Sequence, residues 1–293
     1  MPEHYRSFNH YLQETFGCRV HRLSLNAGFG CPNLDGPLSL DGCIFCDNRA
    51  FSRYARTQVP LKNQIEDSMS AARKRFKAEK FIAYFQSFSS THASPKILLS
   101  QYSVIRDFPD IVGLAVSTRP DCVDEEKLDV LAGFTKDYKV YVEYGLQSAN
   151  DATLKSINRN HDFAAFCRAV AMSVNRNIDL AVHVMLGLPG ETRQDMLDTA
   201  KKISQLPLWG IKFHCLHVIK GTKLEELYRN GEIKLLSQAE YADILVEFLR
   251  LIPRDWVILR LVSDADPAML VAPDWINRKQ ETLTLIEQAL DKK

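Results

Sequence analysis

Three cysteines near the N-terminus are the residues whose type and spacing are best suited to chemistry. Cys31, Cys43 and Cys46 lie in the segment GFGCPNLDGPLSLDGCIFC, directly after the apolar run Val20–Leu25, which we expect to form a strand. Cysteine thiolate is the usual protein ligand of iron–sulfur clusters. Three thiolates on one loop would hold three irons of a [4Fe–4S] cluster and leave the fourth open, as an open position distinguishes a catalytic zinc site from a structural one. The loop therefore predicts a cluster with one iron free to bind a small molecule.

The Cys43/Cys46 pair taken alone has two other interpretations, a redox dithiol or half of a zinc site. A zinc site needs a fourth ligand, but the sequence has no second Cys-x-x-Cys and no His-x-x-x-His pair. A redox dithiol favours a helix start, whereas this pair lies in a glycine-rich loop. The cysteines Cys18, Cys167 and Cys215 share no ligand spacing, so we expect no second cluster.

Length and composition are those of an ordinary globular chain. With 293 residues, 46% hydrophobic and 25% charged, it is long enough for one large α/β domain or two small ones. We expect a cytoplasmic protein with no membrane contact, because no long apolar run or signal-peptide pattern is present. A net charge of +1 creates no strong overall electrostatic attraction for nucleic acid. It does not exclude a local basic patch that binds RNA.

Short β-rich runs alternate with helical patterns. Strands separated by helices require parallel pairing with right-handed crossovers, in an open doubly wound sheet or one curled as part of a barrel. The runs are Val20–Asn26, Phe81–Gln86, Ile111–Ser117, Val140–Leu146, Leu180–Leu186 and Ile211–Ile219. Most end in polar or glycine-bearing residues, and ligands collect at the carboxyl ends of parallel strands, so we expect these ends to surround a binding site.

Helices are expected where apolar residues recur with the 3.6-residue period, as at Ile65, Met69, Ala72 and Phe76, and at Met196, Ala200 and Ile203. Ser94 and Asp124 are predicted N-caps of two others. The tail shows helical patterns at Tyr241–Leu251 and Trp275–Leu290, with a short strand between them at Trp256–Val262. We expect a main domain at 1–237 and a C-terminal extension, 238–293, packed on it.

Several motifs together resemble a known family. The Cys-x11-Cys-x2-Cys loop, with Phe45 before its last cysteine, is similar to the cluster loop of radical S-adenosylmethionine (SAM) enzymes, and its long first gap resembles the branch containing the catalytic subunit of Elongator. Further matches, in order, are STRPD (Ser117–Asp121), VEYGLQS ending at Ser148, INRNH (Ile157–His161), MLGLPGE (Met185–Glu191), LHVIKGT (Leu216–Thr222) and APDW (Ala272–Trp275). The sequence departs from the family pattern in two places. Leu34 and Pro37 flank Asp35-Gly36 where arginine and threonine are expected, and Asn160 replaces a usual glycine.

The resemblance implies a partial (β/α)6 TIM-like barrel with a small C-terminal α/β extension, and a [4Fe–4S] cluster and SAM as cofactors. Reductive cleavage of SAM at the open iron would give methionine and a 5′-deoxyadenosyl radical that abstracts hydrogen from substrate. An electron donor such as flavodoxin or ferredoxin is implied, and tRNA is a possible partner.

The resemblance also implies contacts with SAM. Arg159 would pair with the SAM carboxylate through a bidentate, charge-assisted interaction, although a lone helix-end arginine is more often solvated. Gln147 would contact the ribose or the substrate. The MLGLPGE loop would lie beside the adenine, or be a plain strand-to-helix turn. The remaining predicted contacts are Leu186 and Gly187 for adenine, Gln86 and Ser87 for the SAM amino group, and Ser117 and Thr118 for the ribose hydroxyls.

Candidates on the substrate side are fewer. Cys122 could donate a hydrogen atom near a radical, or be a buried thiol that behaves as a small hydrophobe. Lys220 could meet an anionic or carbonyl group of substrate, whereas His214 and His217 on the same run fit satisfied core or rim positions. Arg73 and Lys74 could belong to a phosphate-binding face or to a solvated helix face, together with Arg75, Lys77, Arg53, Arg56 and Lys62.

Three functions follow from these patterns. The first is a radical SAM enzyme that modifies a tRNA wobble-uridine side chain, by removing or rearranging an existing substituent, since no room for an acetyltransferase domain is seen. The second keeps the radical chemistry but acts on a small molecule, a lipid or a protein. The third is an iron–sulfur redox sensor.

Overall fold

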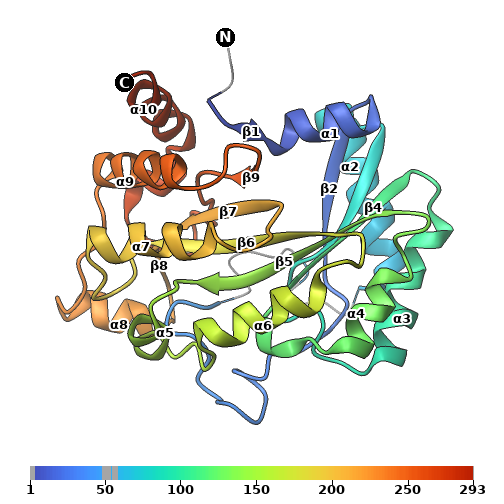
Figure 1. Cartoon of the computed structure of the whole chain (residues 1–293), viewed down its shortest axis with the longest axis horizontal. Coiled ribbons are helices and arrows are strands. Elements are labelled where there is room, and N and C mark those ends of the chain that lie inside the picture. Colours follow the sequence, from blue (N-terminus) through green and yellow to red (C-terminus); the bar gives the residue numbers. More distant parts are fainter. Residues whose placement is uncertain (1–3, 48–53, 55–58, 293) are drawn as a thin grey trace.

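The structure, a computed structural model, describes residues 4–47, 54 and 59–292. Its centre is an eight-stranded parallel sheet of order β1-β9-β7-β6-β5-β4-β3-β2, curled into a half-barrel (Figure 1). The strands are β1 (Arg6–Ser7), β2 (Val20–Leu25), β3 (Lys80–Phe85), β4 (Ile111–Thr118), β5 (Lys139–Gln147), β6 (Ile178–Leu186), β7 (Gly210–Cys215) and β9 (Val257–Arg260). The predicted α/β fold, a partial TIM-like barrel with a C-terminal extension, is confirmed.

The six predicted runs correspond to β2 through β7, with one difference at the last. The expected run Ile211–Ile219 is broken after Cys215, and its end forms β8 (Val218–Ile219), which pairs antiparallel with β10 (Leu270–Ala272). The break arises because the chain leaves the curled sheet there to form a second, two-stranded one. The run IKFHCLHVI contains no glycine, proline or other turn residue, so the sequence does not reveal this change of sheet.

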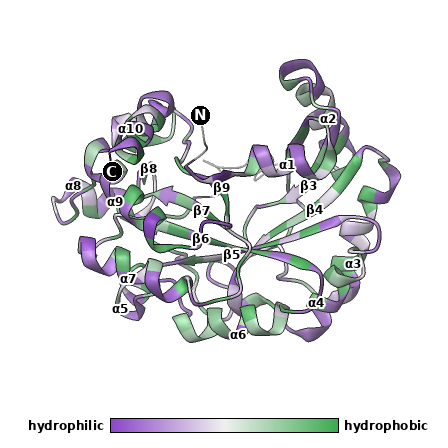
Figure 2. Cartoon of the chain, turned by 45° about the horizontal axis from the view of Figure 1, so that its top comes forward, coloured by the Kyte–Doolittle hydropathy of each residue, from purple (hydrophilic) through white to green (hydrophobic). Residues whose placement is uncertain are grey.

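Helices cover the outer side of the sheet (Figure 2). They are α2 (Leu61–Phe76), α3 (Pro95–Ser103), α4 (Glu125–Ala132), α5 (Asp151–Ser156), α6 (Phe163–Ser173) and α7 (Arg193–Ile203). The predicted stripes are buried, except that Phe76 is half-buried at its helix end. Asp124 caps α4 by accepting the Lys127 N–H at 2.9 Å, whereas Ser94 takes the N-cap position of α3 without a side-chain capping bond.

The C-terminal region contributes α8 (Lys223–Arg229), α9 (Gln238–Leu251) and α10 (Lys279–Asp291). The predicted helical pattern from Trp275 to Leu290 begins late, because Asp274–Asn277 forms a separate 3₁₀ turn after Pro273. The predicted strand at 256–262 is β9, which enters the main sheet between β7 and β1. No helix in the described ranges is both long and apolar enough to cross a membrane.

The amino end of the half-barrel is closed by α1 (Phe8–Phe16). Tyr11 packs against Trp209 with ring centroids 4.8 Å apart, and Trp209 against Tyr141 at 5.2 Å. Phe8 contacts the Tyr141 and Trp209 rings edge-on. This aromatic layer packs at the amino ends of the strands, and a smaller cavity of about 360 Å³ lies beside it, between α1, β2 and β9.

Candidate active site

A cavity of about 900 Å³ lies inside the half-barrel at the carboxyl ends of its strands. The loop that follows β2 brings Cys31, Cys43 and Cys46 into its wall. Gln86, Ser117, Thr118, Gln147 and Arg159 line the same cavity, so five of the predicted SAM contacts and all three cysteines share one space.

The cysteine loop is held in place by the segment after α5. The amide N–H of Ile44 donates to the Ile157 carbonyl at 3.2 Å, and the Asn33 side chain donates to the Asn158 carbonyl at 2.7 Å. Asn160 donates to the Asn33 side-chain oxygen at 2.5 Å. Asn160 has φ 55°, which explains why asparagine can stand in for glycine here, since it tolerates the left-handed region best among residues with a side chain. The departure from the family pattern thus adds a hydrogen bond to the loop.

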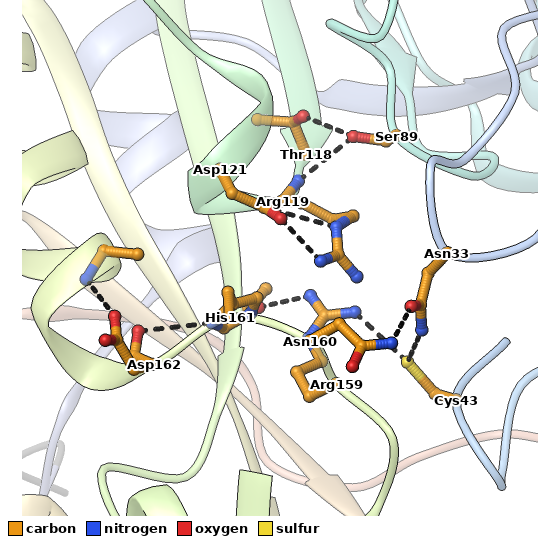
Figure 3. Close-up of polar contacts among 12 residues, drawn as sticks. Asn33, Cys43, Ser89, Thr118, Arg119, Asp121, Arg159, Asn160, His161 and Asp162 are labelled. Carbon is orange, nitrogen blue, oxygen red and sulfur yellow. Dashed lines mark hydrogen bonds and ion pairs between the residues drawn. The ribbon is translucent and has the colours of Figure 1, made fainter. Parts of the chain in front are cut away.

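Polar donors surround the thiols. The Asn33 amide and the Arg159 guanidinium each lie 3.5 Å from the Cys43 sulfur (Figure 3). Burial raises the pKa of Cys31, and burial together with the neighbouring thiols raises that of Cys46 to about 12. Ligation to iron deprotonates a thiol, and donors to sulfur stabilise the resulting charge.

The three thiols do not form a site for one metal ion. In the part of the chain that the structure describes, no three His, Cys, Asp or Glu side chains meet closely enough to hold a single ion. A mononuclear zinc site requires such convergence. A [4Fe–4S] cluster places a different demand on the protein, since each thiolate binds its own iron. Three thiols on one cavity wall are the number that a [4Fe–4S] cluster with one open iron requires.

Arg159 and Gln147 each present a buried polar atom that no described residue pairs with. Arg159 is only 8% exposed and donates to the Gly145 carbonyl, while its Nε finds no partner among the described residues. Gln147 follows an irregularity in the pairing of β5 with β6, has φ 81°, and leaves its Oε1 buried without a partner among the same residues. Backbone strain and unpaired buried groups of this kind mark a ligand site.

A side chain at position 145 would interfere with this arrangement. A Cβ on Gly145 would lie 2.8 Å from the Arg159 Nη2. The VEYGLQS motif therefore needs glycine there so that the guanidinium can approach the strand.

Ser117 and Thr118 line the cavity, but the Thr118 hydroxyl is already engaged. Its oxygen lies 2.9 Å from the Ser89 hydroxyl and 2.6 Å from that of Thr91. The Ser89 amide donates to the Gly30 carbonyl at 3.1 Å. Thr118 thus helps to fix the loop beside the cysteines, which competes with its predicted contact to ribose.

Three predicted SAM contacts are not brought into the cavity wall. Leu186 points from β6 into the outer core, because alternate residues of a strand face opposite sides, and Met185 lines the cavity instead. Gly187 has φ 86°, and its amide donates to the Met196 sulfur at 3.2 Å. Ser87 is buried in the turn after β3, where the Ser90 hydroxyl donates to its carbonyl at 3.3 Å.

The predicted substrate residues also lie outside the cavity wall. Cys122 is buried behind the site in a 3₁₀ turn, and burial raises its pKa to about 11. Lys220 is exposed, and its ammonium donates to the Ala268 carbonyl at 2.7 Å. The geometry favours a structural role for both.

The predicted basic face lies on α2, on the outside of the barrel. Arg73 pairs with Asp110 at 2.5 Å and Lys62 with Asp107 at 2.8 Å, so acidic neighbours offset part of its charge. Lys74 is exposed there. Arg53 and Arg56 lie outside the described residues.

Arg119 is a site residue that the sequence analysis missed. It is 2% exposed, and Asp121 fixes it through two hydrogen bonds of 2.9 and 2.7 Å. Its Nη1 has no partner within the described ranges and the residue lines the cavity, on the same side as Arg159 and Cys43 (Figure 3). The available signal was its position directly after Ser117-Thr118 at a strand end.

Comparison with known proteins agrees with this geometry. The family model for the radical SAM superfamily matches residues 30–203, and that for the Radical_SAM C-terminal domain matches residues 208–292. The chain belongs to the radical SAM superfamily. It is a radical SAM enzyme, and its cofactors are a [4Fe–4S] cluster and SAM.

Individual proteins resemble this radical SAM enzyme in sequence or in fold. It is 34% identical to the protein YtqA of Bacillus subtilis (strain 168) over 288 residues, covering 98% of this chain and 89% of that one. It is 28% identical to Elongator complex protein 3 of Saccharomyces cerevisiae over 203 residues, 68% of this chain but only 35% of that protein. An archaeal Elp3 from Methanocaldococcus infernus shares the fold, with a TM-score of 0.63 at 16% identity over 92% of this chain and 64% of that one.

Proposed function

We propose that this chain cleaves SAM in the barrel cavity and uses the resulting radical to modify the side chain of a tRNA wobble uridine. The observation that carries the SAM site is the convergence of the three cysteines with the unpaired atoms of Arg159 and Gln147 on one cavity. The tRNA substrate is supported by the segment shared with Elongator complex protein 3.

Each residue has a distinct part in this proposal. Cys31, Cys43 and Cys46 hold the cluster, which when loaded with SAM and reduced by a flavodoxin or ferredoxin supplies the 5′-deoxyadenosyl radical. Arg159 binds the SAM carboxylate, and Gln147 accepts a hydrogen bond from ribose or substrate. The aromatic layer at the amino end excludes water from the cavity and protects the radical from side reactions.

Two measurements test the proposal in steps. Anaerobically reconstituted, reduced protein with SAM should yield 5′-deoxyadenosine, and its absence would favour the redox-sensor hypothesis. Mass spectrometry of tRNA nucleosides from cells with and without the gene should then show one altered wobble uridine. An unchanged profile in both aerobic and anaerobic cells would contradict the tRNA substrate.

A small molecule, lipid or protein is the second candidate substrate. The net charge of +1 favours it, as do the acidic partners of the basic residues on α2. The salt dependence of tRNA binding separates the two: contact with several phosphates makes affinity fall steeply with salt, whereas a shallow dependence would favour the second candidate.

A further inference from the structure

The inner wall of the barrel carries more positive than negative charge below the cysteine loop. Arg22 of β2 and Lys212 of β7 contact one acidic residue of β5, Glu143. Arg260 of β9 lies opposite Lys212 in the sheet. Glu143 lies two residues before Gly145, so at about 3.3 Å per residue this layer is about 7 Å deeper than the carbonyl that Arg159 contacts. We call Lys212 and Arg260, which both line the cavity, the cationic floor.

The Glu143 carboxylate is fully occupied by other groups. It is 0% exposed and accepts hydrogen bonds from the Tyr84 hydroxyl at 2.9 Å and from His183 at 2.7 Å, and it is paired with Arg22. Lys212 stands 3.5 Å from it and donates to the Tyr84 hydroxyl at 2.8 Å. Arg22 and Lys212 therefore share the single negative charge of Glu143, which leaves one positive charge in excess.

Arg260 has no acidic partner at ion-pair distance among the described residues. Its guanidinium lies 2.7 Å from the His214 ring and 3.4 Å from the Phe213 carbonyl. Burial, with Arg260 beside it, holds the pKa of His214 well below its ordinary value, so His214 is a neutral acceptor. Asp264, which also lines the cavity, is 3.1 Å from Lys279.

Lys212 is buried and Arg260 is partly buried. Lys212 shares Glu143 with Arg22, and Asp264 acts on Arg260 only from beyond ion-pair distance. Cations withdrawn from water in this way are costly unless further negative charge compensates them. Lys212 is 7% exposed, and burial lowers its pKa to about 8, so at neutral pH most molecules carry the charge. A carboxylate or a phosphate is the natural partner of an arginine beside a lysine.

We propose that the cationic floor binds an anionic group of the substrate, a carboxylate or a phosphate, and so holds the substrate between the floor and the SAM site. This rests on the proposed function, since it assigns a substrate to the same cavity. The anionic group has to reach the depth of Glu143, below the cysteine loop, to meet both cations.

The test measures anion binding without SAM. Cluster-loaded protein is titrated anaerobically with inorganic phosphate and, separately, with acetate, by calorimetry at constant ionic strength set with chloride. We expect one of the two anions to bind, and Lys212→Gln and Arg260→Gln each to weaken it about tenfold or more, the effect of a lost hydrogen bond to a charged group. Arg260→Lys, which keeps the charge, should weaken it less.

Matched controls come from α7 on the outer face. Arg193→Gln removes a cation paired with Glu247, and Lys202→Gln removes one that donates to the Ala149 carbonyl. Both should bind the anion as the parent protein does. Circular dichroism shows whether each variant is folded. If either Arg260→Gln or Lys212→Gln fails to fold, the other variant still tests anion binding.

The outcomes separate the possibilities. Binding of acetate but not phosphate assigns a carboxylate, and the reverse assigns a phosphate. Absence of binding to the parent protein, or equal affinity in floor and control variants, would overturn the proposal. A failure to form 5′-deoxyadenosine would instead contradict the proposed function, since the titration contains no SAM.

Discussion

At the scale of single residues, the site is recognisable by what the protein leaves unpaired. Buried polar atoms usually find partners, yet Arg119, Gln147 and Arg159 each keep one unpaired among the described residues, and all three line the cavity. A ligand with both donors and acceptors would satisfy them together. SAM, with its carboxylate, amino group and ribose, has this character.

The cluster assignment leads to the first prediction. Cys43→Ala should abolish both the iron–sulfur absorbance and SAM cleavage, because two thiolates hold the cluster poorly against solvent. Iron content and 5′-deoxyadenosine formation measure the two effects. Cys167→Ala, on α6 and away from the cavity wall, is the control and should retain both. Normal iron and turnover in the Cys43 variant would refute the assignment.

Gly145 tests the position of Arg159 without removing it. Gly145→Ala places a Cβ 2.8 Å from the guanidinium and should displace it, which weakens SAM binding while the cluster stays intact. Arg159→Ala should act in the same direction and more strongly, by about 1.5–3 kcal/mol for a lost bond to a charged group. Equilibrium SAM binding to the cluster-loaded protein measures both.

The control for this pair is Gly36→Ala on the cysteine loop. A Cβ at Gly36 would meet no atom closer than 3.5 Å, so ordinary contact is kept and SAM affinity should not change. An unchanged affinity in the Gly145 variant would mean that Arg159 does not need its observed position.

The sequence alone predicts some of the residues that line the cavity but not all of them. Cysteine spacing and the GLQS and NR motifs pointed to Cys31, Gln147 and Arg159, which the structure brings to one cavity. Arg119 was missed because an arginine has no characteristic spacing, and only its burial and its two bonds to Asp121 distinguish it from a surface residue.

At the scale of elements, the phase of each strand decides which residues reach the cavity. The predicted strand Leu180–Leu186 is the end of β6, in which His183 and Met185 line the cavity and Leu186 faces the outer core. In the sequence, His183 alone marks the inner face of this run. Parallel strands covered on both sides lack the alternation that would fix this phase. The adenine contact at Leu186 stays a prediction for its backbone, since its side chain lies in the outer core.

The turn after β6 gives a pH-dependent prediction. Burial raises the pKa of Glu191 from 4.5 to about 7, although the Ser148 hydroxyl donates to its carboxylate. The folded state then binds the proton more tightly than the unfolded state. Stability from this group is therefore present below pH 4.5 and is lost as the pH rises through 7.

Glu191→Gln keeps an acceptor for Ser148 but removes the charge. It should raise the melting temperature at pH 8 and leave it almost unchanged near pH 5, by thermal denaturation of the apoprotein. Asp198→Asn on α7 is the control, since hydrogen bonds from Lys201 and Gln194 lower the pKa of Asp198, so its charge is the same at pH 5 and pH 8 and the effect of the substitution should not depend on pH. Equal melting temperatures for Glu191→Gln and the parent protein at pH 8 would show that the buried Glu191 charge does not destabilise the fold.

At the scale of the whole molecule, the two ends of the chain complete the sheet. β9 pairs with β7, and β1 at the N-terminus pairs with β9 in parallel, so the edge of the half-barrel is built from both termini (Figure 1). The sequence predicts a strand at 256–262 in the C-terminal extension but not the strands it pairs with, because register between distant strands has no local signal. It therefore could not place Arg260 beside Lys212.

Truncation tests this closure. Removing residues 238–293 takes away α9 and β9, including the fully buried side chains of Tyr241, Leu245, Phe248 and Val257. At about 2 kcal/mol for each buried side chain, the loss approaches the 5–15 kcal/mol that stabilises a typical domain. We expect the truncated chain to lose cooperative unfolding, measured by circular dichroism and amide hydrogen exchange.

Removal of residues 279–293 alone, which deletes α10 and keeps β9, should lower stability but preserve a cooperative transition. If the 1–237 chain unfolds cooperatively and still assembles its cluster, the C-terminal region is an independent addition and β9 is not needed to close the site.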